Sequence, residues 1–334
     1  MTSTLIVTTI NGPNDVLHAL ADGAKKENTD FIVVGDRKTP ANFQMDRVRY
    51  FSPAAQDELF PQISQLIPWN HYARKNIGYL AALASGSDWL VETDDDNYPI
   101  EGFFQNPDKL AGVRPVETEG DWLNAYDCFN PDKDVWPRGY PLELLAQRWQ
   151  NPVQYGAELE VEPCLVQGLA DDNPDVDAVF RLTRQLPVVF DKGVKPIRLN
   201  PGNWCPFNSQ NTWIRRDIAA LAYLPSFCSF RMTDIWRSFV SQRCLWEQGE
   251  GVVFIAPTVR QERNEHNLLK DFEDEVPGYV KNNFIVSLLT ETTLVGDYSS
   301  DITRCYESLV KAEIIPAKEL QLLRAWLTEV DRLA

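Results

Sequence analysis

The chain lacks the cysteine spacings of a zinc or redox cluster. Its six cysteines are widely scattered, and none forms a Cys-x-x-Cys pair. This pattern argues against a zinc site built from cysteines. Scattered cysteines are typical of buried thiols in a reducing compartment, which is the state we expect here.

Long apolar runs and an excess of positive charge are also missing. No apolar run approaches ~18 residues, and no charged segment precedes an apolar one near the N-terminus, so we expect no membrane segment and a cytoplasmic protein. Acidic residues outnumber basic ones by 48 to 32, which gives a net charge of −16. Such a chain repels polyanions, so we expect no nucleic-acid partner. A diphosphate ligand would need a metal ion or a few well-placed cations.

What is present is the pattern of an α/β protein. Short apolar, β-branched runs predict strands over residues 4–10, 31–34 and 88–93. Helical spacing predicts helices over residues 15–26 and 71–84. Strands that alternate with helices across short turns predict a parallel, doubly wound sheet.

The second half of the chain is less regular. Residues 105–210 hold many of the 22 prolines and give no clear periodicity. Helical spacing returns at about residue 232, residues 252–255 resemble a late strand, and the last fifty residues alternate apolar and charged groups at helical spacing. We therefore predict one large α/β domain over residues 1–280 and a helical extension over residues 281–334.

Three adjacent carboxylates, Asp94, Asp95 and Asp96, follow the strand predicted over residues 88–93. Adjacent carboxylates repel one another unless a cation or water compensates them. The carboxyl ends of strands in an open α/β sheet are where ligands bind, and hard oxygen ligands suit Mg²⁺ or Mn²⁺. The alternative is a solvated acidic turn, which the preceding apolar strand makes less favourable.

Two basic residues, Arg74 and Lys75, lie some twenty positions before the acidic triplet. They are candidate cations for a diphosphate or a nucleotide base. The alternative is a solvated cationic helix face. A nucleotidyltransferase is disfavoured, because residues 11–14 after the first strand are too short for a glycine-rich phosphate loop.

The block from His71 to Asn97 resembles the front half of inverting-type family 2 glycosyltransferases, in which an Arg/Lys-Asn-x-Gly helix precedes a strand ending in the Asp-x-Asp signature. Further blocks resemble reversibly glycosylated polypeptides, the plant UDP-arabinopyranose mutase group. The best match is to the STELLO family of glycosyltransferases and covers most of residues 30–280. It is carried by the segments VFRLT (179–183), PFNSQNT (206–212), SFR (229–231), DIWR (234–237), PTV (257–259) and KDFEDE (270–275).

The resemblance implies a GT-A-type fold, in which a mixed, mostly parallel sheet is flanked by helices. It also implies transfer of a sugar from a nucleoside-diphosphate sugar, with a UDP-sugar favoured, to an unknown glycan, protein or small-molecule acceptor. Mn²⁺ or Mg²⁺ would be bound with the donor. The residues expected to contact the donor or the metal are Asp36, Arg74, Lys75, Asp94, Asp95 and Asp96.

Two further site residues follow from the resemblance. Asp234 falls where the superfamily places the carboxylate nearest the acceptor, so it is the expected general base; the alternative is a cap for the helix that follows. His266 follows the late strand and is a candidate third metal ligand, although its polar setting suits a surface loop equally well. Two other functions stay open: a mutase that interconverts the ring forms of UDP-arabinose, and a catalytically silent scaffold with the same fold.

Overall fold

The computed structural model describes residues 1–130, 134–146, 150–262 and 267–333. Strands and helices alternate along its first hundred residues, as the hydrophobic pattern predicts. These elements are β1 (Ser3–Thr9), α1 (Asp15–Lys26), β2 (Asp30–Gly35), β3 (Arg49–Phe51), α2 (Pro53–Leu59), α3 (Pro61–Leu66), η1 (Tyr72–Arg74), α4 (Lys75–Ala84), β4 (Trp89–Thr93) and β5 (Asn97–Pro99).

The middle of the chain consists mainly of short elements. They are β6 (Leu110–Glu117), α5 (Ala125–Phe129), η2 (Leu142–Leu144), β7 (Gln154–Tyr155), β8 (Leu159–Val161), β9 (Leu165–Asp171), α6 (Ala178–Thr183), β10 (Ile197–Leu199), β11 (Asn211–Arg215), η4 (Arg216–Ala222) and η5 (Phe230–Met232). The last third holds α7 (Thr233–Trp246), β12 (Val253–Gln261), α8 (Leu268–Glu291), α9 (Tyr298–Lys311) and α10 (Lys318–Leu333).

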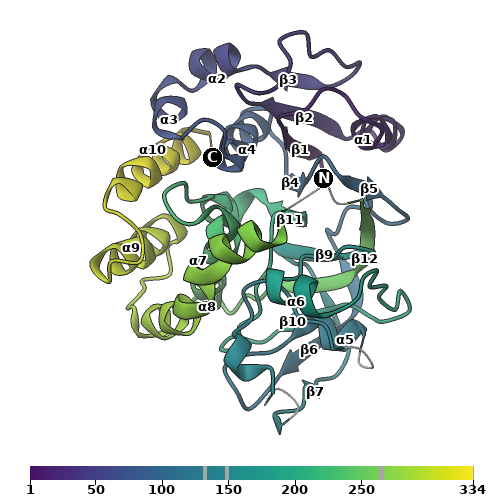
Figure 1. Cartoon of the computed structure of the whole chain (residues 1–334), viewed down its shortest axis with the longest axis vertical. Coiled ribbons are helices and arrows are strands. Elements are labelled where there is room, and N and C mark those ends of the chain that lie inside the picture. Colours follow the sequence, from purple (N-terminus) through teal and green to yellow (C-terminus); the bar gives the residue numbers. More distant parts are fainter. Residues whose placement is uncertain (131–133, 147–149, 263–266, 334) are drawn as a thin grey trace.

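The strands form one mixed sheet with the order β3-β2-β1-β4-β11-β9-β12-β10-β6-β7 (Figure 1). The half from β3 to β4 is parallel. Beyond it, β11 runs antiparallel to both β4 and β9, whereas β9 and β12 are parallel. The expected mixed sheet flanked by helices is therefore confirmed, as is the helical C-terminal end. Sequence periodicity missed β9, because all seven of its residues are buried and the strand shows no alternation.

Side chains at alternate positions of the central strands point into two separate apolar cores. Ile6 and Leu90 point to the core shared with α4, whereas Leu5 and Val91 point to the core under α1. This alternation is the period-two pattern of a strand buried on both faces. The sheet is thus fixed from both sides, and its edges are where polar groups can gather.

Helix α4 lies unusually close to the sheet. Gly78 allows this approach, because a Cβ atom at that position would come within 2.5 Å of the Ile6 side chain and 3.0 Å of Val34. Helix α1 is fixed differently: the Asn14 side chain accepts a hydrogen bond from the Leu17 amide at 2.8 Å and caps the helix. Both helices therefore begin at defined points beside the carboxyl ends of β1, β2 and β4.

The C-terminal helices pack onto the domain they follow. Helix α10 contacts α3 and α4, and α9 contacts α7, which Figure 1 shows on the side of the molecule that carries α4. The buried Glu319 at the start of α10 accepts a hydrogen bond from the Phe227 amide at 2.8 Å and others from the Tyr223 hydroxyl and the Ser226 amide. The boundary we expect at residue 280 falls inside α8, and the division of the chain there stays a prediction.

Candidate active site

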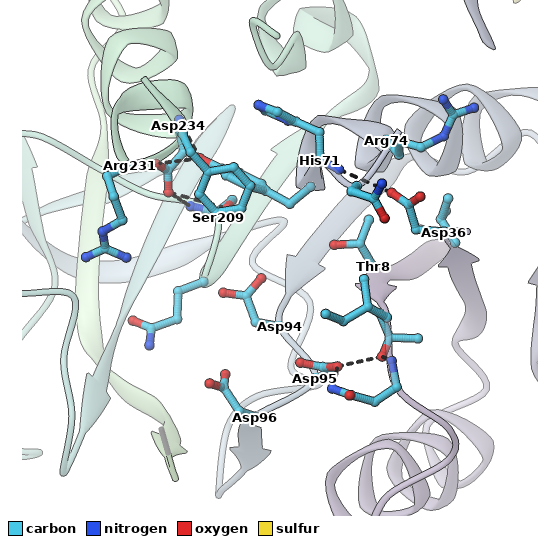
Figure 2. Close-up of a pocket in the computed structure, with 18 of the residues that line it drawn as sticks. Thr8, Asp36, His71, Arg74, Asp94, Asp95, Asp96, Ser209, Arg231 and Asp234 are labelled. Atoms are coloured by element: carbon cyan, nitrogen blue, oxygen red, sulfur yellow. Dashed lines mark hydrogen bonds between the residues drawn. The ribbon is translucent and has the colours of Figure 1, made fainter. Parts of the chain in front are cut away.

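A cavity of about 620 Å³ opens where β1, β2 and β4 end. Its volume is in the range of small-molecule sites. Two groups of side chains face one another across it (Figure 2). We call the N-terminal wall the lining residues Thr8, Thr9, Asp36, His71, Asp94, Asp95 and Asp96. We call the C-terminal wall the lining residues Arg138, Asp175, Ser209, Phe230 and Asp234.

Each carboxylate of the acidic triplet has a different setting. Asp94 accepts a hydrogen bond from the Lys75 ammonium at 2.9 Å. Asp95 accepts one from the Thr9 hydroxyl at 2.5 Å, and its backbone carbonyl accepts another from the side-chain amide of Asn14 at 2.8 Å. Asp96 accepts one from the side-chain amide of Gln261 at 3.1 Å. Strand β4 ends in this turn, so the triplet lies at the carboxyl edge of the sheet, where the sequence places it.

The Asp94 carboxylate is poorly solvated, although 39 % of the side chain is exposed to the cavity. Loss of water raises its pKa to about 6, repulsion from Asp96 adds to the rise, and Lys75 opposes it. A divalent cation would relieve this repulsion, because it favours the ionised form of both carboxylates.

Lys75 is buried beneath the triplet rather than exposed above it. Its ammonium donates to the Thr93 carbonyl at 3.0 Å, to Asp94 at 2.9 Å and to the Ser209 carbonyl at 3.1 Å. These three acceptors use all three N–H groups. In this geometry Lys75 holds Asp94 and links the two walls through Ser209, and its contact with a diphosphate stays a prediction.

Arg74 also differs from expectation. Its guanidinium donates to the Gln56 side chain at 2.6 Å, the Ile67 carbonyl at 2.9 Å and the Ser64 hydroxyl at 2.5 Å. It also stacks on the Trp69 ring, at 3.4 Å from the ring centroid. Figure 2 shows the guanidinium turned away from the triplet. Its role is to brace the start of α4, and direct contact with a phosphate does not fit this arrangement.

Asp36 lies at the end of β2 and faces the cavity. Its carboxylate accepts hydrogen bonds from the Arg37 amide at 2.6 Å and the His71 amide at 3.2 Å. The two oxygens are thereby oriented, and each keeps further acceptor capacity for a ligand. Burial lowers the pKa of His71 to about 4, with Asp36 opposing the shift, so the imidazole is neutral near pH 7.

The C-terminal wall is organised by one arginine between two carboxylates. Arg138 donates twice to Asp175, at 2.8 Å in both bonds, and twice to Asp234, at 3.0 Å in both. Asp234 also accepts hydrogen bonds from the Tyr72 hydroxyl and the Ser209 amide, each at 3.1 Å. Burial alone would raise the pKa of Asp234, but the Arg138 guanidinium holds it well below its usual range.

A carboxylate with these donors is a weak base. For Asp234 to remove a proton from an acceptor hydroxyl, it would have to exchange one of its present donors for that hydroxyl. Its catalytic role stays a prediction. The second wall was largely beyond sequence reasoning, because nothing in the sequence pairs Arg138 and Asp175 with residue 234.

Of the three expected metal ligands, Asp94 and Asp96 line the cavity. The third, His266, lies outside the described residues. Among residues 1–130, 134–146, 150–262 and 267–333, no group of three or more His, Cys, Asp or Glu side chains has the arrangement of a metal site. Asp94 and Asp96 still supply hard oxygen donors in one cavity, and Mg²⁺-type sites use one or two carboxylates together with substrate phosphates. The residues present therefore fit a cation that arrives with a diphosphate.

The fold and the acidic edge of the sheet define the class of protein: an α/β chain with a GT-A-like fold. Comparison with known proteins shows which glycosyltransferases the chain resembles. Residues 231–334 match the family model of the STELLO glycosyltransferases. The chain is 26 % identical to "Probable glycosyltransferase STELLO2" of Arabidopsis thaliana over 357 residues, which cover 98 % of this chain and 44 % of that protein. It is 27 % identical to "Probable glycosyltransferase STELLO1" over 275 residues, which cover 77 % and 35 %.

The resemblance to the STELLO glycosyltransferases is thus confirmed. It also extends into the C-terminal helices, which the short motifs did not cover. The chain spans less than half the length of these curated relatives. A solved structure described as a mycobacterial protein aligns with 84 % of this chain and 74 % of its own, at 10 % identity and a TM-score of 0.39. A match that loose carries no argument about function. Within the described part of the chain, no helix combines the length and apolarity needed to cross a bilayer.

Proposed function

We propose that this chain is a glycosyltransferase that moves a sugar from a nucleoside-diphosphate sugar, with a UDP-sugar favoured, to an acceptor, and that Mn²⁺ or Mg²⁺ is bound with the donor. The observation that carries the proposal is the acidic triplet. Asp94, Asp95 and Asp96 share one cavity, and Lys75 pairs with Asp94 at 2.9 Å. The likeness to the STELLO glycosyltransferases supports the same function.

Asp94 and Asp96 are the residues that would hold the cation. When bound, the cation would neutralise the diphosphate and favour its departure from the sugar. Asp36, fixed by the His71 amide, is placed to accept hydrogen bonds from the nucleoside. Lys75 keeps Asp94 in position from below. Asp234 stays the candidate acceptor of the proton from the attacking hydroxyl.

A catalytically silent scaffold is the second candidate. One observation favours it: Asp234 is occupied by Arg138, Tyr72 and Ser209. Hydrolysis of a UDP-sugar by the chain without any acceptor would exclude a silent scaffold.

The test is a thermal-shift screen with UDP, GDP, CDP and dTDP, each with Mn²⁺ and with EDTA. At about 100 times its dissociation constant, a ligand stabilises the fold by about 2.7 kcal/mol. We expect a Mn²⁺-dependent shift with one nucleotide, loss of the shift in Asp96→Ala, and an unchanged shift in Asp22→Ala, which removes an exposed aspartate on α1. If no nucleotide shifts the melting temperature of the wild-type chain, the proposal fails.

A further inference from the structure

Phe230, at the start of η5, is unusual among the residues that line the cavity. It is 46 % exposed, and in the C-terminal wall the other members, Arg138, Asp175, Ser209 and Asp234, are buried or half-buried. Exposed phenylalanines also occur on α8, so exposure alone means little. What distinguishes Phe230 is its place at the mouth of the cavity that also holds the candidate metal ligands and the candidate general base.

Two other aromatic rings contact Phe230 edge to face, and neither is stacked parallel to it. The Tyr72 ring centroid lies 4.8 Å away with the planes at 80°, and the His71 centroid lies 5.1 Å away at 65°. Edge-to-face contacts of this kind favour one ring orientation. Neither neighbour is stacked on Phe230, which leaves aromatic surface open to a ligand.

The groups beside this ring suit hydroxyl-rich ligands. The hydroxyl of Tyr72, on which Phe230 packs, is hydrogen-bonded to Asp234 at 3.1 Å, and Arg138 joins Asp234 to Asp175. Each Asp175 oxygen accepts one hydrogen bond from Arg138 and keeps capacity to accept another from a sugar hydroxyl, whereas the five N–H groups of Arg138 are used within the chain. The C–H face of a pyranose carries slight positive charge and matches the negative face of an aromatic ring.

The charged groups on this side are paired within the chain. Arg138 joins Asp175 and Asp234, and Arg231, which also lines the cavity, pairs with Glu275 at 2.8 Å. Paired groups of this kind suit a ligand that has no charge of its own. The N-terminal wall has the donor-binding candidates, Asp36 and the acidic triplet. A ring at the mouth on the opposite wall is therefore placed for a ligand other than the donor.

We propose that Phe230 is the stacking platform of an acceptor subsite and that the acceptor is a carbohydrate, with a neutral pyranose ring lying on Phe230. This inference rests on the proposed glycosyltransferase function, because it assumes that the donor occupies the acidic edge of the cavity. It names Phe230 as a residue that selects the acceptor and not the donor.

The experiment uses saturation-transfer NMR and titration with a panel of methyl pyranosides at millimolar concentration, in the presence of UDP and Mn²⁺. We expect binding to the wild-type chain through ring protons, about three- to tenfold weaker binding to Phe230→Ala, and recovery in Phe230→Trp. Phe284→Ala, which removes a 53 % exposed ring on α8, is the matched control and should bind like the wild type. UDP affinity should be equal in all four proteins.

Other outcomes overturn the inference in distinguishable ways. Stacking tolerates changes in sugar stereochemistry, so absence of binding across the whole panel rejects the platform while UDP binding still supports the proposed function. If Phe230→Ala weakens binding of UDP-glucose but not UDP, the ring contacts the donor sugar and the acceptor assignment is wrong. If the wild type binds no nucleotide, the proposed function itself fails.

Discussion

The two walls of the cavity deal with charge in opposite ways. In the N-terminal wall, Lys75 pairs with Asp94, and repulsion between Asp94 and Asp96 helps to raise the pKa of Asp94. In the C-terminal wall, Arg138 binds two carboxylates in two-pronged pairs, and the pKa of Asp234 is lowered. The first wall keeps two carboxylates that repel one another and would suit a cation, whereas the second is close to balanced and suits uncharged hydroxyl groups.

The largest effect should come from breaking the balanced wall. Replacing Arg138 with Met leaves Asp175 and Asp234 without their shared cation inside the protein, and loss of one partner of a buried pair costs about 3–5 kcal/mol. Urea unfolding followed by tryptophan fluorescence measures this loss. The control is Arg260→Met, because Arg260 and its partner Glu262 are exposed and such pairs contribute at most about 1 kcal/mol. Equal losses in both variants would show that Arg138 does not hold the wall together.

How far each wall could be predicted follows from how it is built. In the N-terminal wall, Asp36 and the acidic triplet directly follow short apolar strands, so Asp36 and Asp94 could be placed at the sheet edge from sequence alone. The C-terminal wall joins residues 96 positions apart, Arg138 and Asp234, through loops that have no periodic pattern. Its polar partners are fixed by tertiary packing, which one sequence does not encode in local spacing.

The same reasoning explains why the settings of Arg74 and Lys75 differ from those expected. Both are candidate ligand contacts in the sequence because arginine and lysine pair with diphosphates. The sequence does not show that α4 is buried along nearly its whole length. Buried cations need internal acceptors, and both residues find them in the chain.

The second prediction compares one carboxylate from each wall. Asp96→Asn removes charge where the cation should bind, so we expect at least a tenfold loss, about 1.4 kcal/mol, in affinity for UDP with Mn²⁺. Asp175→Asn removes charge from the balanced wall and should change that affinity by less than about twofold. Isothermal titration calorimetry in Mn²⁺ and in EDTA gives both values. A larger loss in Asp175→Asn would place the diphosphate on the C-terminal wall.

A third test concerns the helix that positions the N-terminal wall. In Gly78→Ala the new methyl group would overlap Ile6, and crowding of this kind costs about 1–3 kcal/mol. Gly12→Ala is the matched control, because its nearest neighbour would be 3.8 Å away. Thermal unfolding of both variants checks the difference. If Gly78→Ala is as stable as Gly12→Ala, close packing of α4 on β1 does not determine the position of Lys75 and Asp94.

The last prediction is a pH dependence that the N-terminal wall should show. The pKa of Asp94 is raised to about 6, and a proton competes with a cation for this carboxylate, so affinity for UDP-glucose with Mn²⁺ should fall by about tenfold per pH unit below about pH 6. UDP-glucose is the suitable probe because its diphosphate does not titrate in this range.

Unfolding of the chain does not explain this loss of affinity. A carboxylate whose pKa is raised by folding adds stability as pH falls through 6, so protonation of Asp94 does not unfold the chain. Calorimetric titrations between about pH 5 and pH 8 measure the slope, and titrations in EDTA should show none. A flat profile with Mn²⁺ would mean that Asp94 is not a metal ligand and that Asp96 holds the cation without it.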